Sequence, residues 1–326
     1  MNILVTGGAG YVGSVVVEEL LKSGNKVISL DNMQQGHKGA IHSGAEFISM
    51  DICALEALDK VFARYHFDAV VHMAAETLVE YSVTDPGRYF RSNVIGGINL
   101  LDTMLKYNVY KIIFSSTAAI YGEPQSDLID EDHPKTPINS YGESKLMFEN
   151  ILKWYGRAYG LKHISLRYFN AAGATKLLGE DHCPETHLIP NVLKAAWNQS
   201  EPVKVFGADY QTRDGSCIRD YVHVRDIAQA HVLSLDKLGD TSSGAYNLGN
   251  GAGYSVFDVV RTAEKVARVK IPVKVSSRRP GDPAVLVASS HKAKQELSWK
   301  PQFPELESII ESAWKWLSEH PNGYER

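Results

Sequence analysis

Tyr141 and Lys145, four residues apart, are the side chains of this sequence best suited to proton transfer. The pattern predicts a helix over residues 140–160, and residues four apart on a helix share one face. A free tyrosine has a pKa of about 10, so it is a poor base at neutral pH. A neighbouring ammonium group favours the phenolate and lowers that pKa. Such a pair can take a proton from an alcohol or sugar hydroxyl, although the same spacing also occurs on ordinary solvated helices.

A glycine-rich turn near the start of the chain indicates a dinucleotide site. A short apolar run is followed by Gly7-Gly8-Ala9-Gly10-Tyr11-Val12-Gly13, a helical pattern over 15–23 and a second strand that ends at Asp31. Glycines let the backbone approach a pyrophosphate, whose charge is met by the N-terminus of the following helix. Asp31 lies 18 residues after Gly13, where a carboxylate accepts from the adenosine ribose and repels a 2′-phosphate. The sequence therefore predicts NAD rather than NADP; a tight turn in a flavodoxin-like domain that binds nothing is the alternative.

Composition agrees with an enzyme of the cytoplasm. The chain has 326 residues, enough for one large or two modest domains, and a net charge of −4, which disfavours a broad nucleic-acid surface. Three distant cysteines, Cys53, Cys183 and Cys217, indicate a reducing compartment rather than a disulfide framework. The chain begins directly in a strand, so we expect no signal peptide, and no apolar run has the length of a membrane span.

The elements that must position these residues alternate between strand and helix. Apolar strands are expected at 46–50, 69–73, 111–116 and 163–168, and helices at 55–65, 88–107 and 140–159. Nearly all-apolar strands are typical of a parallel sheet covered on both faces. After Asn170 the alternation of strands and helices ends, and a loop-rich stretch with one helix at about 189–198 follows. Residues 219–235 are expected to return to the main sheet through a strand at 221–224 and a helix from Asp226, and helices follow at 256–267 and 306–317.

The fold class predicted from this order is α/β. We expect a Rossmann-type doubly wound parallel sheet with a smaller mixed α/β substrate domain. The predicted boundaries place residues 1–170 and about 219–248 in the dinucleotide-binding domain, and about 171–218 and 249–326 in the smaller domain.

Further motifs carry a family resemblance. They are His72-Met73-Ala74-Ala75, Ser115-Ser116-Thr117, Tyr168-Phe169-Asn170, the segments 205–210 and 214–221, and Arg278-Arg279-Pro280-Gly281-Asp282-Pro283. With the glycine turn and the Tyr141–Lys145 pair, they make the whole chain similar to the extended short-chain dehydrogenase/reductases, and within them to the UDP-glucose 4-epimerase (UDP-galactose 4-epimerase) family.

The resemblance implies an isomerase that interconverts UDP-glucose and UDP-galactose through a transient 4-keto sugar. It implies that Tyr141 is the acid and base, that Lys145 lowers its pKa and bonds the nicotinamide ribose, and that Thr117 bonds the C4 hydroxyl. Asp51 and Ile52 would flank the adenine, and Asn93 would bond near the nicotinamide ribose. The full set of implied NAD residues is Gly7, Gly10, Tyr11, Val12, Gly13, Asp31, Asn32, Asp51, Ile52, Met73, Ala74, Ala75, Asn93, Ser115, Tyr141, Lys145 and Tyr168.

The resemblance also implies a UDP-sugar site in the second half. Arg219 and Arg279 would hold the diphosphate, because a planar guanidinium suits its charge, and Asn170 would add an amide donor. Phe206 would pack on uracil and Asp282 would accept from the uridine ribose. The implied substrate residues are Thr117, Tyr141, Phe169, Asn170, His187, Leu188, Phe206, Arg219, Arg279, Asp282 and Leu286.

Leu286 stands where a tyrosine restricts some relatives to UDP-glucose and UDP-galactose. A leucine there leaves more room, so the N-acetylated pair, UDP-GlcNAc and UDP-GalNAc, is a further expected substrate. Three positions depart from the family pattern: Thr77 replaces a common lysine, Met73 a phenylalanine, and His187 an asparagine.

Relatives form homodimers through the helices at 88–107 and 140–159. Apolar positions beyond those that one core face needs, including Ile98, Leu101, Leu105, Leu152 and Tyr155, are compatible with a second buried face. No metal site is expected, because the spacing of His182, Cys183 and His187 matches no metal module.

Three alternatives stay open. A 4,6-dehydratase needs an extra acid and base after Thr117, where this chain has Ala118 and Ala119, which do not titrate. A UDP-uronic acid 4-epimerase needs a further cation near sugar C6, and the sequence identifies none. A non-catalytic NAD sensor of this fold would typically lack the tyrosine or the lysine.

Overall fold

A parallel seven-stranded sheet forms the centre of the larger part of the molecule. The computed structural model describes residues 1–198, 201–240, 243–279 and 282–324. The strand order is β11-β6-β5-β4-β1-β2-β3, and every neighbouring pair is parallel. The strands are β1 (Asn2–Thr6), β2 (Lys26–Asp31), β3 (Glu46–Ser49), β4 (Ala69–His72), β5 (Lys111–Thr117), β6 (Lys162–Tyr168) and β11 (Gly244–Leu248). The predicted doubly wound sheet is confirmed.

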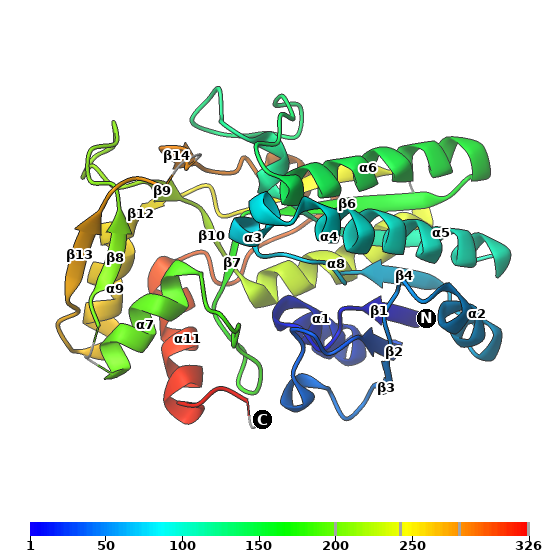
Figure 1. Cartoon of the computed structure of the whole chain (residues 1–326). Helices are drawn as coiled ribbons and strands as arrows, with labels where there is room; N and C mark the ends of the chain where they lie inside the picture. Colours follow the sequence, from blue (N-terminus) through cyan, green and yellow to red (C-terminus); the bar gives the residue numbers. More distant parts are fainter. Residues whose placement is uncertain (199–200, 241–242, 280–281, 325–326) are drawn as a thin grey trace.

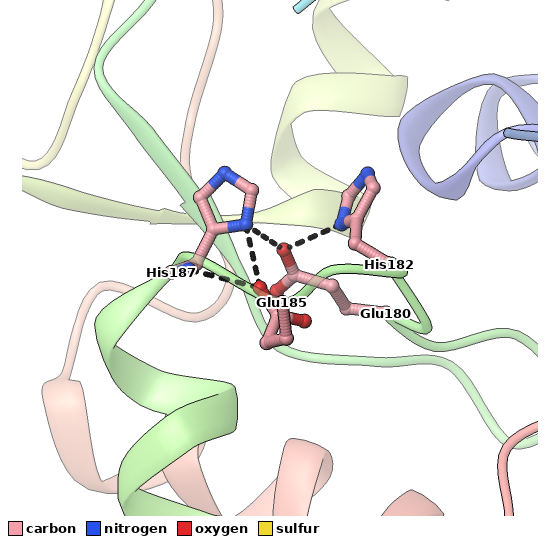
Figure 2. Close-up of side chains that lie close together, drawn as sticks. All are labelled: Glu180, His182, Glu185 and His187. Atoms are coloured by element: carbon pink, nitrogen blue, oxygen red, sulfur yellow. Dashed lines mark hydrogen bonds and ion pairs between the residues drawn. The ribbon is translucent and has the colours of Figure 1, made fainter. Parts of the chain in front are cut away.

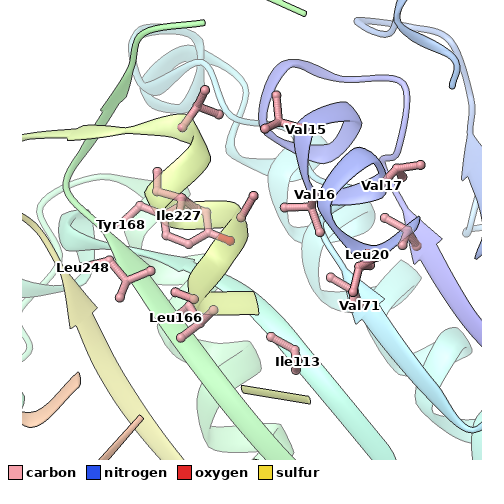
Figure 3. Close-up of a cluster of buried hydrophobic side chains, with 14 of the residues drawn as sticks. Val15, Val16, Val17, Leu20, Val71, Ile113, Leu166, Tyr168, Ile227 and Leu248 are labelled. Atoms are coloured by element: carbon pink, nitrogen blue, oxygen red, sulfur yellow. The ribbon is translucent and has the colours of Figure 1, made fainter. Parts of the chain in front are cut away.

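Helices cover both faces of this sheet (Figure 1). On one face α1 (Tyr11–Lys22) packs beside α8 (Val224–Asp240), and on the other lie α2 (Leu55–Arg64), α5 (Gly96–Lys106) and α6 (Ser140–Tyr159). Successive side chains of a strand point to opposite faces, so Ile3 and Val5 join the first core and Leu4 joins the second. Figure 3 shows part of the first core, where Val16 of α1 and Ile227 of α8 pack over strand residues such as Ile113.

The helix after the glycine turn begins at Tyr11, four residues before the predicted Val15. Gly7 adopts a φ of +74°, and a Cβ atom there would lie 2.6 Å from the backbone nitrogen of Ala74. Only glycine fits this left-handed position beside β4. The earlier start places the open N-terminal turn of α1 directly at the carboxyl end of β1.

The smaller part is a mixture of helices and short strands, as predicted. Its helices α7 (Leu188–Asn198), α9 (Val256–Ala267) and α11 (Leu306–Glu319) share a core of their own. Its strands are β8 (Val203–Phe206) with β13 (Val273–Ser276), and β9 (Ile218–Arg219) between β12 (Tyr254–Ser255) and β14 (Val285–Leu286). We propose the domain division predicted above, because α8 and β11 pack with the main sheet.

Two predicted elements differ in the structure. The strand at 221–224 does not enter the main sheet: β10 (Tyr221–His223) pairs with β7 (Asn170–Ala172), and the chain returns to the sheet through α8 and β11. The helix predicted over 88–107 is interrupted, because α4 (Pro86–Tyr89) continues through a π-helical segment (Phe90–Ile95) into α5. Such π segments are frequent at functional sites.

The remaining elements are short. They are α3 (Val79–Thr84), α10 (His291–Glu296) and the 3₁₀ turns Lys38–Ala40 and Ala118–Tyr121. Within the described ranges, no helix combines the length and apolar character that crossing a membrane requires.

Candidate active site

A cavity of about 1510 Å³ opens at the carboxyl ends of the main strands and continues into the smaller part. Parallel α/β sheets place their ligand sites at this end. Of the residues predicted to bind NAD or substrate, all but Asn93 line this one cavity. The glycine turn lies at the end of β1, Thr117 at the end of β5, and Arg219 and Leu286 on the paired strands β9 and β14.

Tyr141 and Lys145 reach the cavity from the first turns of α6. The side chain of Asn139 caps this helix by accepting from the amide of Gly142 at 2.8 Å. Lys145 is 3% exposed, and its Nζ donates to the carbonyl oxygen of Ser115 at 2.8 Å. Burial lowers the pKa of Lys145 to about 7. The lysine therefore fastens the helix to the end of β5, beside Thr117.

Tyr141 lies against Thr117 in the structure. Burial raises the pKa of Tyr141 above its ordinary value, and a hydrogen bond with the Thr117 side chain opposes that rise. The predicted lowering by Lys145 is not seen in this structure, because burial outweighs the favourable contacts. The Lys145 ammonium donates instead to the carbonyl oxygen of Ser115.

The glycine turn fits a dinucleotide pyrophosphate. Within the described part of the chain no side chain caps the N-terminus of α1 at Gly10, so the first amides of the helix are available to donate. A Cβ at Gly13 would lie 2.0 Å from the carbonyl oxygen of Gly7, so the turn tolerates no side chain there. Tyr11 lines the cavity and donates from its hydroxyl to the carbonyl of Gly173 at 2.6 Å, which ties α1 to the segment after β7.

Asp31 and Asp51 lie at the ends of the neighbouring strands β2 and β3. Asp31 is 7% exposed and accepts from the amides of Ala9 at 3.0 Å and Met33 at 2.9 Å. Its pKa is raised by burial, against those hydrogen bonds. Asp51 accepts from the amide of Cys53 at 2.8 Å and from Asn32 at 3.1 Å. Both carboxylates are held at the edge where an adenosine would lie.

Asn93 lies behind the cavity wall. It is 2% exposed, accepts from the amide of Glu76 at 2.8 Å, and donates to the Glu76 carbonyl and the Ser144 hydroxyl at 3.1 and 2.9 Å. Its side-chain amide is therefore occupied by protein groups, and the contact with the nicotinamide ribose stays a prediction. Asn93 instead joins the π-helical segment, the loop after β4 and α6.

Cationic and aromatic side chains meet at the opposite end of the cavity. The guanidinium carbon of Arg279 lies 3.9 Å from the centroid of the Phe206 ring. Arg219 donates to the carbonyls of Ile218 and Pro283 and pairs with Asp282 at 3.2 Å. Pro280 and Gly281 of the same motif lie outside the described residues.

Other predicted substrate residues surround this end. Asn170 lines the cavity and donates from its side-chain amide to the carbonyl of Asp220 at 2.8 Å, and the apolar side chains of Phe169, Leu188 and Leu286 line the same end. Tyr168 hydrogen-bonds to His231 at 2.6 Å, and burial raises its pKa.

Sequence reasoning missed Glu180 and Glu185, which line the cavity beside His182 and His187. The signal was present in the sequence as acids and histidines that alternate over 180–187, but the spacing of histidine and cysteine alone does not reveal it. Glu180 and Glu185 hold His187 between them and raise its pKa to about 10, although burial opposes this.

Comparison with known proteins agrees with this geometry. The sequence profile of the NAD dependent epimerase/dehydratase family matches residues 3–249, about three quarters of the chain. The chain belongs to the NAD dependent epimerase/dehydratase family. Within this family it is similar to a UDP-glucose 4-epimerase of Halalkalibacterium halodurans, with 52% identity over 99% of this chain and 98% of the relative.

Solved structures of the family share the whole architecture. A crystal structure of a UDP-glucose 4-epimerase superposes with a TM-score of 0.97 at 48% identity, and the match covers 100% of both chains. The UDP-glucose 4-epimerase of Bifidobacterium longum, solved in complex with NAD⁺ and UDP, matches with a TM-score of 0.94 at 38% identity over 99% of this chain and 100% of that one.

Proposed function

We propose that this family member interconverts UDP-glucose and UDP-galactose by NAD-dependent epimerisation at sugar C4, through a transient 4-keto sugar. The observation that carries the proposal is one cavity that joins the glycine turn, the Thr117–Tyr141–Lys145 group and the Arg219–Arg279 end. A cofactor, a reacting hydroxyl and a charged diphosphate would each meet matching groups in it. The full-length likeness to UDP-glucose 4-epimerases supports the same reaction.

NAD suits the larger part of the cavity. Gly7, Gly10 and Gly13 with the free amides of α1 would hold the pyrophosphate, and Asp31 would accept from the adenosine ribose. When bound, NAD takes up the C4 hydride and returns it to the opposite face of the sugar. Bound NAD in the Bifidobacterium longum relative supports this assignment.

Tyr141 is the acid and base in this proposal. As the phenolate it would accept the C4 hydroxyl proton during oxidation, and as the resulting phenol it would return a proton to C4 oxygen during reduction, while Thr117 would share the hydrogen bond at C4. Proton transfer by a positioned side chain contributes typically about 10²–10⁴-fold. Lys145 contributes a positive charge beside the site, and its bond to Ser115 keeps α6 in place.

The nucleotide part of the substrate suits the second half of the chain. Arg219 and Arg279 would clamp the diphosphate, Phe206 would pack against uracil, and Asp282 would bond the ribose once released from Arg219. Asn170, His187 and Leu188 would border the sugar and diphosphate. Leu286 lines the same cavity, so we extend the proposal to the N-acetylated sugar pair.

The deciding experiment is product identity. Purified protein is incubated with UDP-galactose and no added NAD, and the sugars are separated and identified. UDP-glucose is the expected product, and the cofactor is expected to stay with the protein. Recovery of unchanged UDP-galactose from NAD-loaded protein would instead favour a non-catalytic sensor, and conversion of UDP-uronic acids alone would favour the other 4-epimerase.

We also propose a homodimer formed through α5 and α6. Met147 and Trp154 on α6 are 39% and 65% exposed, and Ile95, just before α5, is 52% exposed. Leu101 and Leu152, which the sequence assigned to a second face, are instead fully buried in the monomer core. The exposed apolar side chains are the better support, since they lie outside that core. A concentration-independent monomer in sedimentation would contradict the dimer.

We place the protein in the cytoplasm. Cys53, Cys183 and Cys217 are all free thiols in the structure, as suits a reducing compartment.

A further inference from the structure

We propose that Glu180, His182, Glu185 and His187 form a binding site for one divalent cation, with zinc the best-suited ion. Each of these residues offers one ligand atom, and the four atoms lie within 4.8 Å of one another. Figure 2 shows their side chains converging from a single loop between β7 and α7. The four residues lie in the wall of the same cavity, and the binding test below does not depend on the proposed epimerisation.

The buried carboxylates of this cluster lack sufficient positive charge. The side chains of Glu180 and Glu185 are 8% and 5% exposed. Among the described residues their ion pairs involve histidines alone, and no lysine or arginine pairs with either one. Two carboxylates this close repel each other unless a cation lies between them.

An unpartnered oxygen supports a cation at this position. His187 Nδ1 lies 2.8 Å from Glu180 Oε1 and 2.9 Å from Glu185 Oε1. The other oxygen of Glu185, Oε2, is buried and has no hydrogen-bond partner among the residues that the structure describes. A buried carboxylate oxygen without a partner is costly, and a bound cation would satisfy it.

The donor set favours zinc. Zinc takes imidazole nitrogen and carboxylate oxygen at about 2.0–2.2 Å, usually with four ligands. Four such ligands would lie about 3.3 Å apart in a tetrahedron. His182 Nδ1 already lies 3.1 Å from Glu180 Oε1, so small side-chain movements would suffice. Two imidazoles disfavour magnesium and calcium, which prefer all-oxygen sites.

The position of the site indicates what a bound cation would do. His187 directly precedes α7, and the ring of His182 lies edge-on to Tyr11, with 6.3 Å between ring centroids. Tyr11 belongs to α1 at the glycine turn. The cation would therefore hold the β7–α7 loop as part of the cavity wall, against the helix that is proposed to bind the pyrophosphate. The sequence-based expectation of no metal overlooked the two glutamates that complete this set.

The test is binding of Zn²⁺ alone to the purified full chain after chelator treatment, measured by competition with a chromophoric chelator. We expect one Zn²⁺ per chain and a higher melting temperature with Zn²⁺, since binding to the folded state alone stabilises it. Glu185→Gln and His187→Gln should each weaken binding at least about tenfold. His291→Gln removes an exposed histidine on α10 and should bind as the wild type does.

Cys183→Ser separates this site from an adventitious thiol site, because Cys183 lies in the same loop outside the cluster. Loss of zinc in Cys183→Ser, or unchanged binding in both Glu185→Gln and His187→Gln, would overturn the proposal. So would a wild type that binds no stoichiometric Zn²⁺. Anomalous scattering from zinc-soaked wild-type crystals locates the ion even if a variant fails to fold, and a zinc peak away from these four residues would also reject the site.

Discussion

The Nζ atom of Lys145 lies 2.8 Å from the carbonyl oxygen of Ser115, which joins the start of α6 to the end of β5. The contact places the lysine beside Thr117, the last residue of that strand. Two segments about thirty residues apart thereby bring the Tyr141 phenol, the Thr117 hydroxyl and the Lys145 ammonium to one edge of the sheet.

Replacement of Tyr141 by phenylalanine tests the acid–base assignment. A phenyl ring neither accepts nor donates a proton, so kcat of Tyr141→Phe should fall by about 10²–10⁴-fold, while the fold and the bound NAD are retained. Steady-state rates, circular dichroism and the NAD released on denaturation check this. Tyr159→Phe removes a hydroxyl from the exposed end of the same helix and should leave kcat unchanged. Near-wild-type turnover in the Tyr141 variant would reject its role.

Burial of Lys145 predicts a pH-dependent stability. Its pKa is about 7 in the folded chain, below its ordinary value of 10.5. Between these values the unfolded chain holds a proton that the folded chain does not, so this lysine makes stability rise with pH. Relative to Lys145→Met, cofactor-free wild type should therefore gain stability from pH 7 to about pH 10. Below pH 7 the difference should be constant.

Urea unfolding at a series of pH values measures this difference. Lys153→Met removes an exposed lysine from the same helix and controls for the loss of charge. A wild-type advantage over Lys145→Met that does not change with pH would show that the ammonium is not desolvated.

Asp31 should select NAD over NADP. Its carboxylate is fixed by the amides of Ala9 and Met33 and would repel a 2′-phosphate. Denatured wild type should release NAD(H). The Asp31→Ser variant should retain less NAD than the wild type, and its affinity for NADP relative to NAD should be higher. Chromatography of the released nucleotide makes the comparison. Stoichiometric NADP(H) from wild type would mean that Asp31 does not face the ribose.

Arg167 and Glu149 form an ion pair in which both side chains are 2% exposed, with Nη2 and Oε2 2.7 Å apart. Breaking a buried pair leaves one charge unpaired, so Glu149→Leu should cost about 3–5 kcal/mol of unfolding free energy. The double variant Glu149→Leu/Arg167→Met should lose less than the single variant. Denaturant unfolding measures the free energy of unfolding of both variants. A double variant that is less stable than the single variant would contradict this account.

The pKa of Glu149 also predicts an acid effect. Although burial opposes it, pairing with Arg167 holds the pKa of Glu149 below its ordinary value. The stability that it contributes is therefore present above the ordinary carboxyl pKa and is lost as the pH falls through the lowered value.

Leu286 should set substrate size. It lines the cavity on β14, in register with Arg219, and a tyrosine there would fill space beside the sugar. Leu286→Tyr should reduce kcat/KM for UDP-N-acetylglucosamine by more than tenfold, about the loss of 1.4 kcal/mol or more of transition-state binding, with little change for UDP-glucose. Leu286→Met, which keeps a similar volume, is the matched control. Failure of the wild type to convert the N-acetylated pair would show that Leu286 does not control substrate size.

The sequence by itself determined the local elements of this protein. Helix α6 occupies the predicted 140–159, because its apolar spacing and its Asn139 cap are encoded in neighbouring residues. The apolar strands of the main sheet and the glycine turn were likewise predictable, since burial on both faces and close backbone approach each require particular residue types. The motifs were then sufficient to indicate the cavity-lining residues, apart from Asn93.

Only the tertiary structure decided how separate segments meet. Local patterns could not show that β10 pairs with β7, because strand pairing depends on contacts between distant residues. Nor could they show that Asn93 is occupied by Glu76 and Ser144, or that burial raises the pKa of Tyr141. The cluster of Glu180, His182, Glu185 and His187 is a further example, because the conformation of the loop brings its two glutamates together. Burial and electrostatics are properties of assembled neighbours, and a linear pattern does not contain them.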